Sequence, residues 1–144
     1  MIRSLLWSIS ATLIAGCGLS SPTDNAPPPT GGQAYVLDYN EFATRIDSML
    51  TERGCDNLSC HGGGIRGTFE LSPSTDKDVD MDFSQVSLQV NPAVPSDSPV
   101  LVKPLAVAAG GVAHTADSVQ FGFVDVDDPM YMAILAWIES GEYQ

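Results

Sequence analysis

The sequence predicts a small, mostly α-helical domain with an amphipathic helix near each end and long loops between them. Three observations support this. The chain of 144 residues is 44% apolar, which is enough for one compact core. A first apolar pattern spaced by three and four residues comprises Phe42, Ile46, Met49 and Leu50. A second comprises Tyr131, Ile134, Leu135 and Ile138, with Met130, Ala133 and Trp137 beside it.

Both helices carry end signals. The first runs from Asp38 or Asn40, either of which is a good N-cap, to Arg53, and Gly54 follows as a stop. The last begins after Asp127 or Asp128, has Pro129 in its first turn and ends at Gly141. These signals set the limits of the predicted domain.

The segment between the helices is rich in loop-forming residues. We expect an irregular Gly-rich stretch over Cys55–Gly67, a short extended piece over Phe69–Leu71, an ambiguous apolar segment over Asp82–Val90, a short helix from Ser98–Pro99 through Leu105, and a loop over Ala108–Asp125. Four alternating aspartates, Asp76, Asp78, Asp80 and Asp82, lack the Gly and Glu of a calcium loop, and we expect a solvated acidic loop there.

The amino-terminal segment predicts export. Arg3 precedes an apolar run that ends in small residues, which is typical of a signal peptide over residues 1–16. Leu13-Ile14-Ala15-Gly16-Cys17 resembles the lipobox of bacterial lipoproteins, which implies that Cys17 is lipidated and anchors the protein in a membrane. Gly18 in place of Asp implies the outer membrane, facing the periplasm, so the expected location is the cell envelope. Residues 17–33 form a Pro/Gly/Ser tether, and residues 34–144 form the domain.

The charge is strongly acidic. The formal net charge is −12, and removal of Arg3 with the signal peptide leaves five basic against eighteen acidic side chains, or −13. This charge excludes nucleic acid as a partner, and a soluble electron-transfer partner is expected to be basic where it docks.

The remaining cysteines form the most informative motif. Cys55 and Cys60 are followed at once by His61, Gly62 and Gly63. Two thiols followed by an imidazole are what covalent haem attachment requires, with His61 as proximal iron ligand. Four residues separate the cysteines instead of the usual two, so the extra residues must bulge outward. A Cys55–Cys60 disulfide that stiffens the loop of a haem-free binding or assembly module is the alternative.

The order of several motifs resembles the cytochrome-c-like domains of bacterial lipoproteins over residues 39 to 142. The pieces are Cys60-His61-Gly62-Gly63, Ser98-Pro99-Val100-Leu101-Val102-Lys103-Pro104, His114, Asp128-Pro129-Met130-Tyr131 and Ala136-Trp137-Ile138-Glu139-Ser140-Gly141. The resemblance implies a cytochrome-c-like fold whose two terminal helices cross, haem c as cofactor, and one-electron transfer. It also implies that the sixth iron ligand comes from the loop before the last helix.

Within that loop, His114 is the expected distal ligand, because it is the only histidine outside the motif. Methionine is the alternative sixth ligand, and Met130 is the reserve candidate for it. We nevertheless expect Met130 and Met132 to pack in the core, and Met81 falls in the acidic loop. A zinc site made of Cys55, Cys60, His61 and His114 is disfavoured, because adjacent Cys60 and His61 fit one small ion poorly. The spacing shows no catalytic triad, phosphate loop or paired buried carboxylates, so no enzymatic activity is expected.

Overall fold

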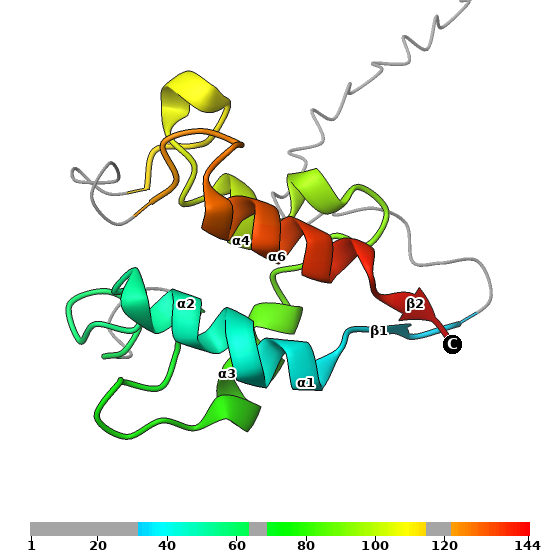
Figure 1. Ribbon diagram of the computed structural model, residues 1–144, viewed down its shortest axis with the longest axis horizontal. Helices are drawn as coiled ribbons and strands as arrows, with labels where there is room; N and C mark the ends of the chain where they lie inside the picture. Colours follow the sequence, from blue (N-terminus) through cyan, green and yellow to red (C-terminus); the bar gives the residue numbers. More distant parts are fainter. Residues whose placement is uncertain (1–31, 64–68, 115–121) are drawn as a thin grey trace, which may run out of the picture.

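The computed structural model describes residues 32–63, 69–114 and 122–144, and its described part is mostly helical, as predicted (Figure 1). The predicted signal peptide, Cys17 and the tether up to residue 31 lie outside the described residues. In chain order the elements are β1 (Tyr35–Val36), α1 (Tyr39–Glu41), η1 (Phe42–Ile46), α2 (Asp47–Glu52), α3 (Val79–Ser87), η2 (Pro95–Asp97), α4 (Pro99–Val102), η3 (Val107–Ala109), α6 (Pro129–Glu139) and β2 (Glu142–Tyr143).

The first predicted helix is confirmed as three consecutive segments, α1, η1 and α2. Asp38 is the N-cap, and its carboxylate accepts a hydrogen bond from the Glu41 N–H at 3.0 Å. Gly54 follows the helix with a φ of 77°, a left-handed conformation that glycine adopts without strain. The middle segment, η1, is π-helical, which the apolar spacing did not predict.

The last predicted helix is confirmed as α6. The Asp128 carboxylate accepts from the Met130 N–H at 2.9 Å, and Pro129 occupies the first turn. Six of its residues are buried, which accounts for most of the predicted apolar face: Met130, Tyr131, Ala133, Ile134, Trp137 and Ile138. Packing is confirmed for Met130, but Met132 is 55% exposed, so the packing role predicted for Met132 is wrong.

The first and last helices lie side by side and form the core between them (Figure 1). The rings of Phe42 and Trp137 lie 5.4 Å apart, and the Trp137 indole N–H donates to the Asp38 carbonyl at 2.8 Å. Antiparallel pairing of β1 with β2, Tyr35 opposite Tyr143, joins the two ends of the domain. These two-residue strands are too short to leave a sequence pattern.

The central segment differs from the predictions. The ambiguous segment, as far as Ser87, and part of the predicted acidic loop form helix α3, which Asp78 caps by accepting from the Met81 N–H at 2.9 Å. Asp80 is exposed and accepts from the Tyr39 hydroxyl, whereas Asp82 is fully buried. The prediction of a solvated acidic loop is therefore wrong for Asp82, and Met81 lies on a helix.

The remaining predictions hold in part. The helix after Ser98 is shorter than predicted and ends at Val102. The Ser98 hydroxyl does not cap this helix but accepts a hydrogen bond from the Asn91 N–H. Phe69–Leu71 forms no strand in the described chain. The described parts of the 108–125 loop are irregular apart from the end of η3 and a parallel bridge between Leu105 and Phe123.

Candidate functional site

The segment that carries Cys55, Cys60 and His61 is a closed turn at the end of α2. The Cys55 N–H donates to the Leu50 carbonyl at 3.0 Å and the Gly54 N–H to the Thr51 carbonyl at 2.9 Å, the Schellman pattern that ends a helix at a left-handed glycine. The His61 N–H donates back to the Cys55 carbonyl at 3.0 Å, so the turn closes between the first cysteine and the histidine. The intervening Asn57, Leu58 and Ser59 are exposed, as expected if the extra residues bulge outward.

The two glycines after His61 allow the chain to pass close to this turn. A Cβ atom on Gly62 would lie 1.8 Å from the Asp56 carbonyl oxygen, and one on Gly63 would lie 2.2 Å from the Leu58 carbonyl oxygen. Both neighbours are backbone atoms, which cannot move aside as a side chain can. Only residues without a Cβ fit this arrangement.

The two predicted iron ligands lie next to each other. The rings of His61 and His114 are stacked, with centroids 5.8 Å apart and planes inclined by 13°, although 52 residues separate them in the sequence. The His61 Nδ1 lies 3.1 Å from the Phe69 carbonyl oxygen. Because a carbonyl only accepts hydrogen bonds, Nδ1 carries the proton and the lone pair is on Nε2.

The protonation of His114 also favours metal binding. Although the His114 side chain is exposed, desolvation by neighbouring atoms, and then repulsion from His61 and Lys103, holds the pKa of His114 below its ordinary value of 6.5. The imidazole is therefore neutral near pH 7, which is the form that binds metals.

The two cysteines are free thiols in the described structure. Cys55 is partly buried and packs against the core. Burial, with a further contribution from the negative charge of Asp56, raises the pKa of the Cys55 thiol to about 12. The thiolate, which is the reactive form, is therefore scarce at this position near neutral pH.

We expect Cys55 of the haem-free chain to react with iodoacetamide about a thousandfold more slowly than a thiol at the ordinary pKa of 9.0, since a rise to about 12 lowers the thiolate fraction by that factor. Peptide mass spectrometry of the Cys60→Ser variant, in which no disulfide can form between the two, measures this rate. Urea should remove the protection. Equal rates with and without urea would contradict the burial of Cys55.

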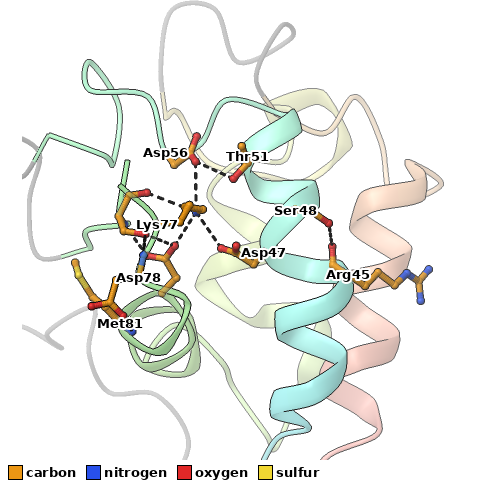
Figure 2. A network of polar contacts seen from close by, with 10 residues as sticks. Arg45, Asp47, Ser48, Thr51, Asp56, Lys77, Asp78 and Met81 are labelled. Carbon is orange, nitrogen blue, oxygen red and sulfur yellow. Dashed lines mark hydrogen bonds and ion pairs between the residues drawn. The ribbon is translucent and has the colours of Figure 1, made fainter. Parts of the chain in front are cut away.

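A buried ionic cluster lies next to the turn, and the sequence pattern did not predict it (Figure 2). The ammonium of Lys77 lies 2.7 Å from Asp82 Oδ2, 3.0 Å from Asp47 Oδ1 and 3.4 Å from Asp56 Oδ2. All three aspartates are buried. We call Lys77, Asp47, Asp56 and Asp82 the Lys77 cluster. One signal was present in the sequence: Asp82 stands four residues before Val86, on the buried face of α3.

Hydrogen bonds hold the carboxylates of this cluster to different degrees. Asp82 accepts from the Ser72 N–H at 2.6 Å and the Ser72 hydroxyl at 2.8 Å, and Asp56 accepts from the Thr51 hydroxyl at 2.8 Å. The Asp47 carboxyl, in contrast, meets the Lys77 ammonium at 3.0 Å through Oδ1, and no hydroxyl or backbone N–H of the described residues donates to that oxygen. Burial, partly opposed by Lys77 and reinforced by Asp82, raises the pKa of Asp47.

A second ion pair fixes the start of the turn to α6. The Arg53 guanidinium meets both carboxylate oxygens of Asp128 at 2.9 to 3.1 Å and donates to the Gly122 carbonyl at 2.6 Å. It also lies over the Phe123 ring, 5.8 Å from its centroid. Arg53 thus connects the cysteine turn to the N-cap of the last helix.

The zinc alternative requires Cys55, Cys60, His61 and His114 around one ion. Within residues 32–63, 69–114 and 122–144, no three His, Cys, Asp or Glu side chains form a group that could hold a metal.

In the same residues, no helix has both the length and the apolar content needed to span a membrane. No protein-family model, curated protein or solved structure matches the chain.

Proposed function

We propose that the chain is a membrane-anchored c-type cytochrome domain that binds haem covalently and transfers single electrons in the cell envelope. The observation that carries this proposal is the near-parallel pair of His61 and His114 beside the cysteine turn. Haem c, when bound, supplies an iron that changes oxidation state by one electron. The domain itself is assigned no catalytic activity.

The two imidazoles are the residues that would hold the iron of a bound haem. Their rings are stacked with centroids 5.8 Å apart, so both side chains lie close enough to serve one iron. His61 would be the proximal ligand and His114 the distal ligand.

The hydrogen bond of His61 adds a second argument. Metal-bound histidines usually donate their other ring N–H to a carbonyl or carboxylate, which fixes the ring and the tautomer. The Phe69 carbonyl does this for Nδ1 of His61 and leaves Nε2 free to bind iron. The order of residues in the turn supports covalent attachment, with Cys55 and Cys60 as the thioether-forming residues.

The fold is compatible with a cytochrome-c-like architecture. The first and last helices pack against each other through Phe42 and Trp137, and His114 belongs to the segment that precedes the last helix. We propose on this basis that residues 34–144 form a cytochrome-c-like domain. Met130 is enclosed in the core, which favours His114 over Met130 as the distal ligand.

An absorption spectrum of the haem-loaded protein tests the ligand assignment. The wild-type protein should be low-spin, without a methionine-to-iron charge-transfer band, and His114→Ala should become high-spin and bind carbon monoxide. Met130→Leu is the matched control and should leave the spectrum unchanged. If Met130→Leu opened the iron while His114→Ala had no effect, the distal ligand would be methionine.

Anchoring through Cys17 is the proposal for cellular location. Cys17→Ser should release the protein from the membrane fraction or leave the signal peptide uncleaved, because the mature chain then carries no acyl chains. Incorporation of radiolabelled fatty acid measures the modification directly. Labelling of the Cys17→Ser variant at the wild-type level would contradict this assignment.

A further inference from the structure

The Lys77 cluster carries more negative charge than one lysine can neutralise. Three carboxylates surround one ammonium, and the side chains of Asp47, Asp56 and Asp82 are 9%, 1% and 0% exposed. If all three were ionised, the cluster would hold an excess of two negative charges away from water. Such a charge is costly to bury, so binding of a proton is favoured.

Asp47 is the member best placed to hold this proton. Among the described residues, the Lys77 ammonium is the one donor group that meets the Asp47 carboxyl, 3.0 Å from Oδ1, whereas Asp82 and Asp56 also accept hydrogen bonds from Ser72 and Thr51. A carboxylate with less support from other donors gains more from binding a proton. The raised pKa of Asp47 agrees with this geometry. The proton can come from solvent, because the Lys77 side chain is 22% exposed and opens the cluster to water.

The charged groups that face Asp47 come from each element packed around it. Lys77 faces it from the segment before α3, Asp82 from α3, and Asp56 shares the same lysine from the cysteine turn. The other charged residues of α2 and α3 are turned away: Glu52 is exposed, Asp78 caps α3, and Asp80 accepts from Tyr39.

The cluster is joined to the proposed haem attachment turn through Asp56. Its side chain belongs to the cluster, while the preceding residue is Cys55. Its carbonyl oxygen packs against Gly62, directly after His61. The charge of the cluster therefore lies beside the residues proposed to hold the haem, in a low-dielectric interior where charges interact strongly.

We propose that the Lys77 cluster is a proton-binding site coupled to the oxidation state of the domain, so that a proton enters it when an electron does. This inference rests on the proposed function. One electron from a reduced donor protein lowers the positive charge at the haem site by one, and one proton from water converts a carboxylate of the cluster to a carboxylic acid. The step thus adds one electron and one proton and leaves the total charge unchanged.

The test is the reduction potential of the haem-loaded protein as a function of pH. The wild-type potential should fall as pH rises across the range in which Asp47 loses its proton, with a slope of at most about 59 mV for each tenfold change in proton concentration. Asp47→Asn should remove this slope. Asp76→Asn is the control: it changes an exposed neighbour of Lys77 in the sequence, and the slope of potential against pH should remain. A flat wild-type profile, or an unchanged slope in Asp47→Asn, would overturn the proposal.

Infrared spectroscopy of the haem-free chain separates this inference from the proposed function. A protonated carboxyl band should persist to higher pH than for ordinary aspartates and should disappear in Asp47→Asn. If that band is present but the chain takes up no haem, the proton site stands and the electron-transfer function fails. If haem is bound but the band is absent, the proton site is wrong.

Discussion

Replacing Lys77 with methionine is expected to lower the free energy of unfolding by about 3–5 kcal/mol at neutral pH, the usual cost of removing one partner from a buried ionic cluster. Methionine keeps the length of the side chain but leaves Asp47, Asp56 and Asp82 without a counter-charge. Urea denaturation of the wild-type and Lys77→Met proteins, with equal m-values, measures the difference.

Arg45→Met is the matched control. Arg45 also loses an ion pair, with Glu41 at 3.3 Å, but its side chain is 56% exposed. Exposed pairs contribute about 0–1 kcal/mol, so this variant should remain close to the wild type. Similar losses in the two variants would show that the Lys77 cluster is no more important than a surface ion pair.

The effect of Lys77→Met should depend on pH. The folded pKa of Lys77 is raised, so the stability that its charge contributes is complete below the ordinary value of 10.5 and is lost as pH rises through the folded pKa. The folded pKa of Asp47 is also raised, so its contribution is complete below 3.8 and declines as pH rises through its folded value. The destabilisation by Lys77→Met should therefore shrink in acid, where the carboxyls are protonated.

Gly62→Ala is expected to prevent the cysteine turn from closing as it does in the wild-type protein. The added Cβ would lie 1.8 Å from the Asp56 carbonyl oxygen and 2.7 Å from its carbon, so the backbone itself must shift. We expect a loss of about 3 kcal/mol, at the upper end of the usual range for overpacked sites. Covalent haem incorporation should fall sharply, because Cys55, Cys60 and His61 would no longer keep their relative positions.

Leu58→Ala is the control for this change. The Leu58 side chain is 66% exposed on the same turn, and its truncation should leave both stability and haem incorporation near the wild-type level. Haem content per polypeptide, measured by absorbance, gives the readout. Wild-type haem content in Gly62→Ala would contradict the role given to this close contact.

The helices were predictable because their signals are local. Asp38 and Gly54 bound the first helix, and Asp128 and Pro129 begin the last, in agreement with their capping preferences. The π-helical turn and the paired strands depend on tertiary contacts, and nothing in the local pattern indicates them. Helix α3 was obscured because its first turn is acidic and resembles a loop.

The candidate site was predictable only in part. The sequence motif named Cys55, Cys60 and His61, and the choice of His114 followed from the scarcity of histidine. The Lys77 cluster could not be predicted, because Asp47, Asp56 and Lys77 come from separate segments and look like surface residues one at a time. These charged side chains can be buried because the ammonium and the carboxylates pair with each other, and this pairing exists only in the folded chain.

The mass of the intact protein, purified from a host with cytochrome c maturation, tests the proposed function most directly. We expect the mass of the processed, acylated polypeptide plus one haem, retained after denaturation because thioether bonds survive unfolding, together with a Soret band. Trypsin digestion should place the haem on the peptide that contains Cys55 and Cys60. A mass equal to the same acylated polypeptide minus two hydrogens, without a Soret band, would establish the disulfide instead and contradict the cytochrome assignment.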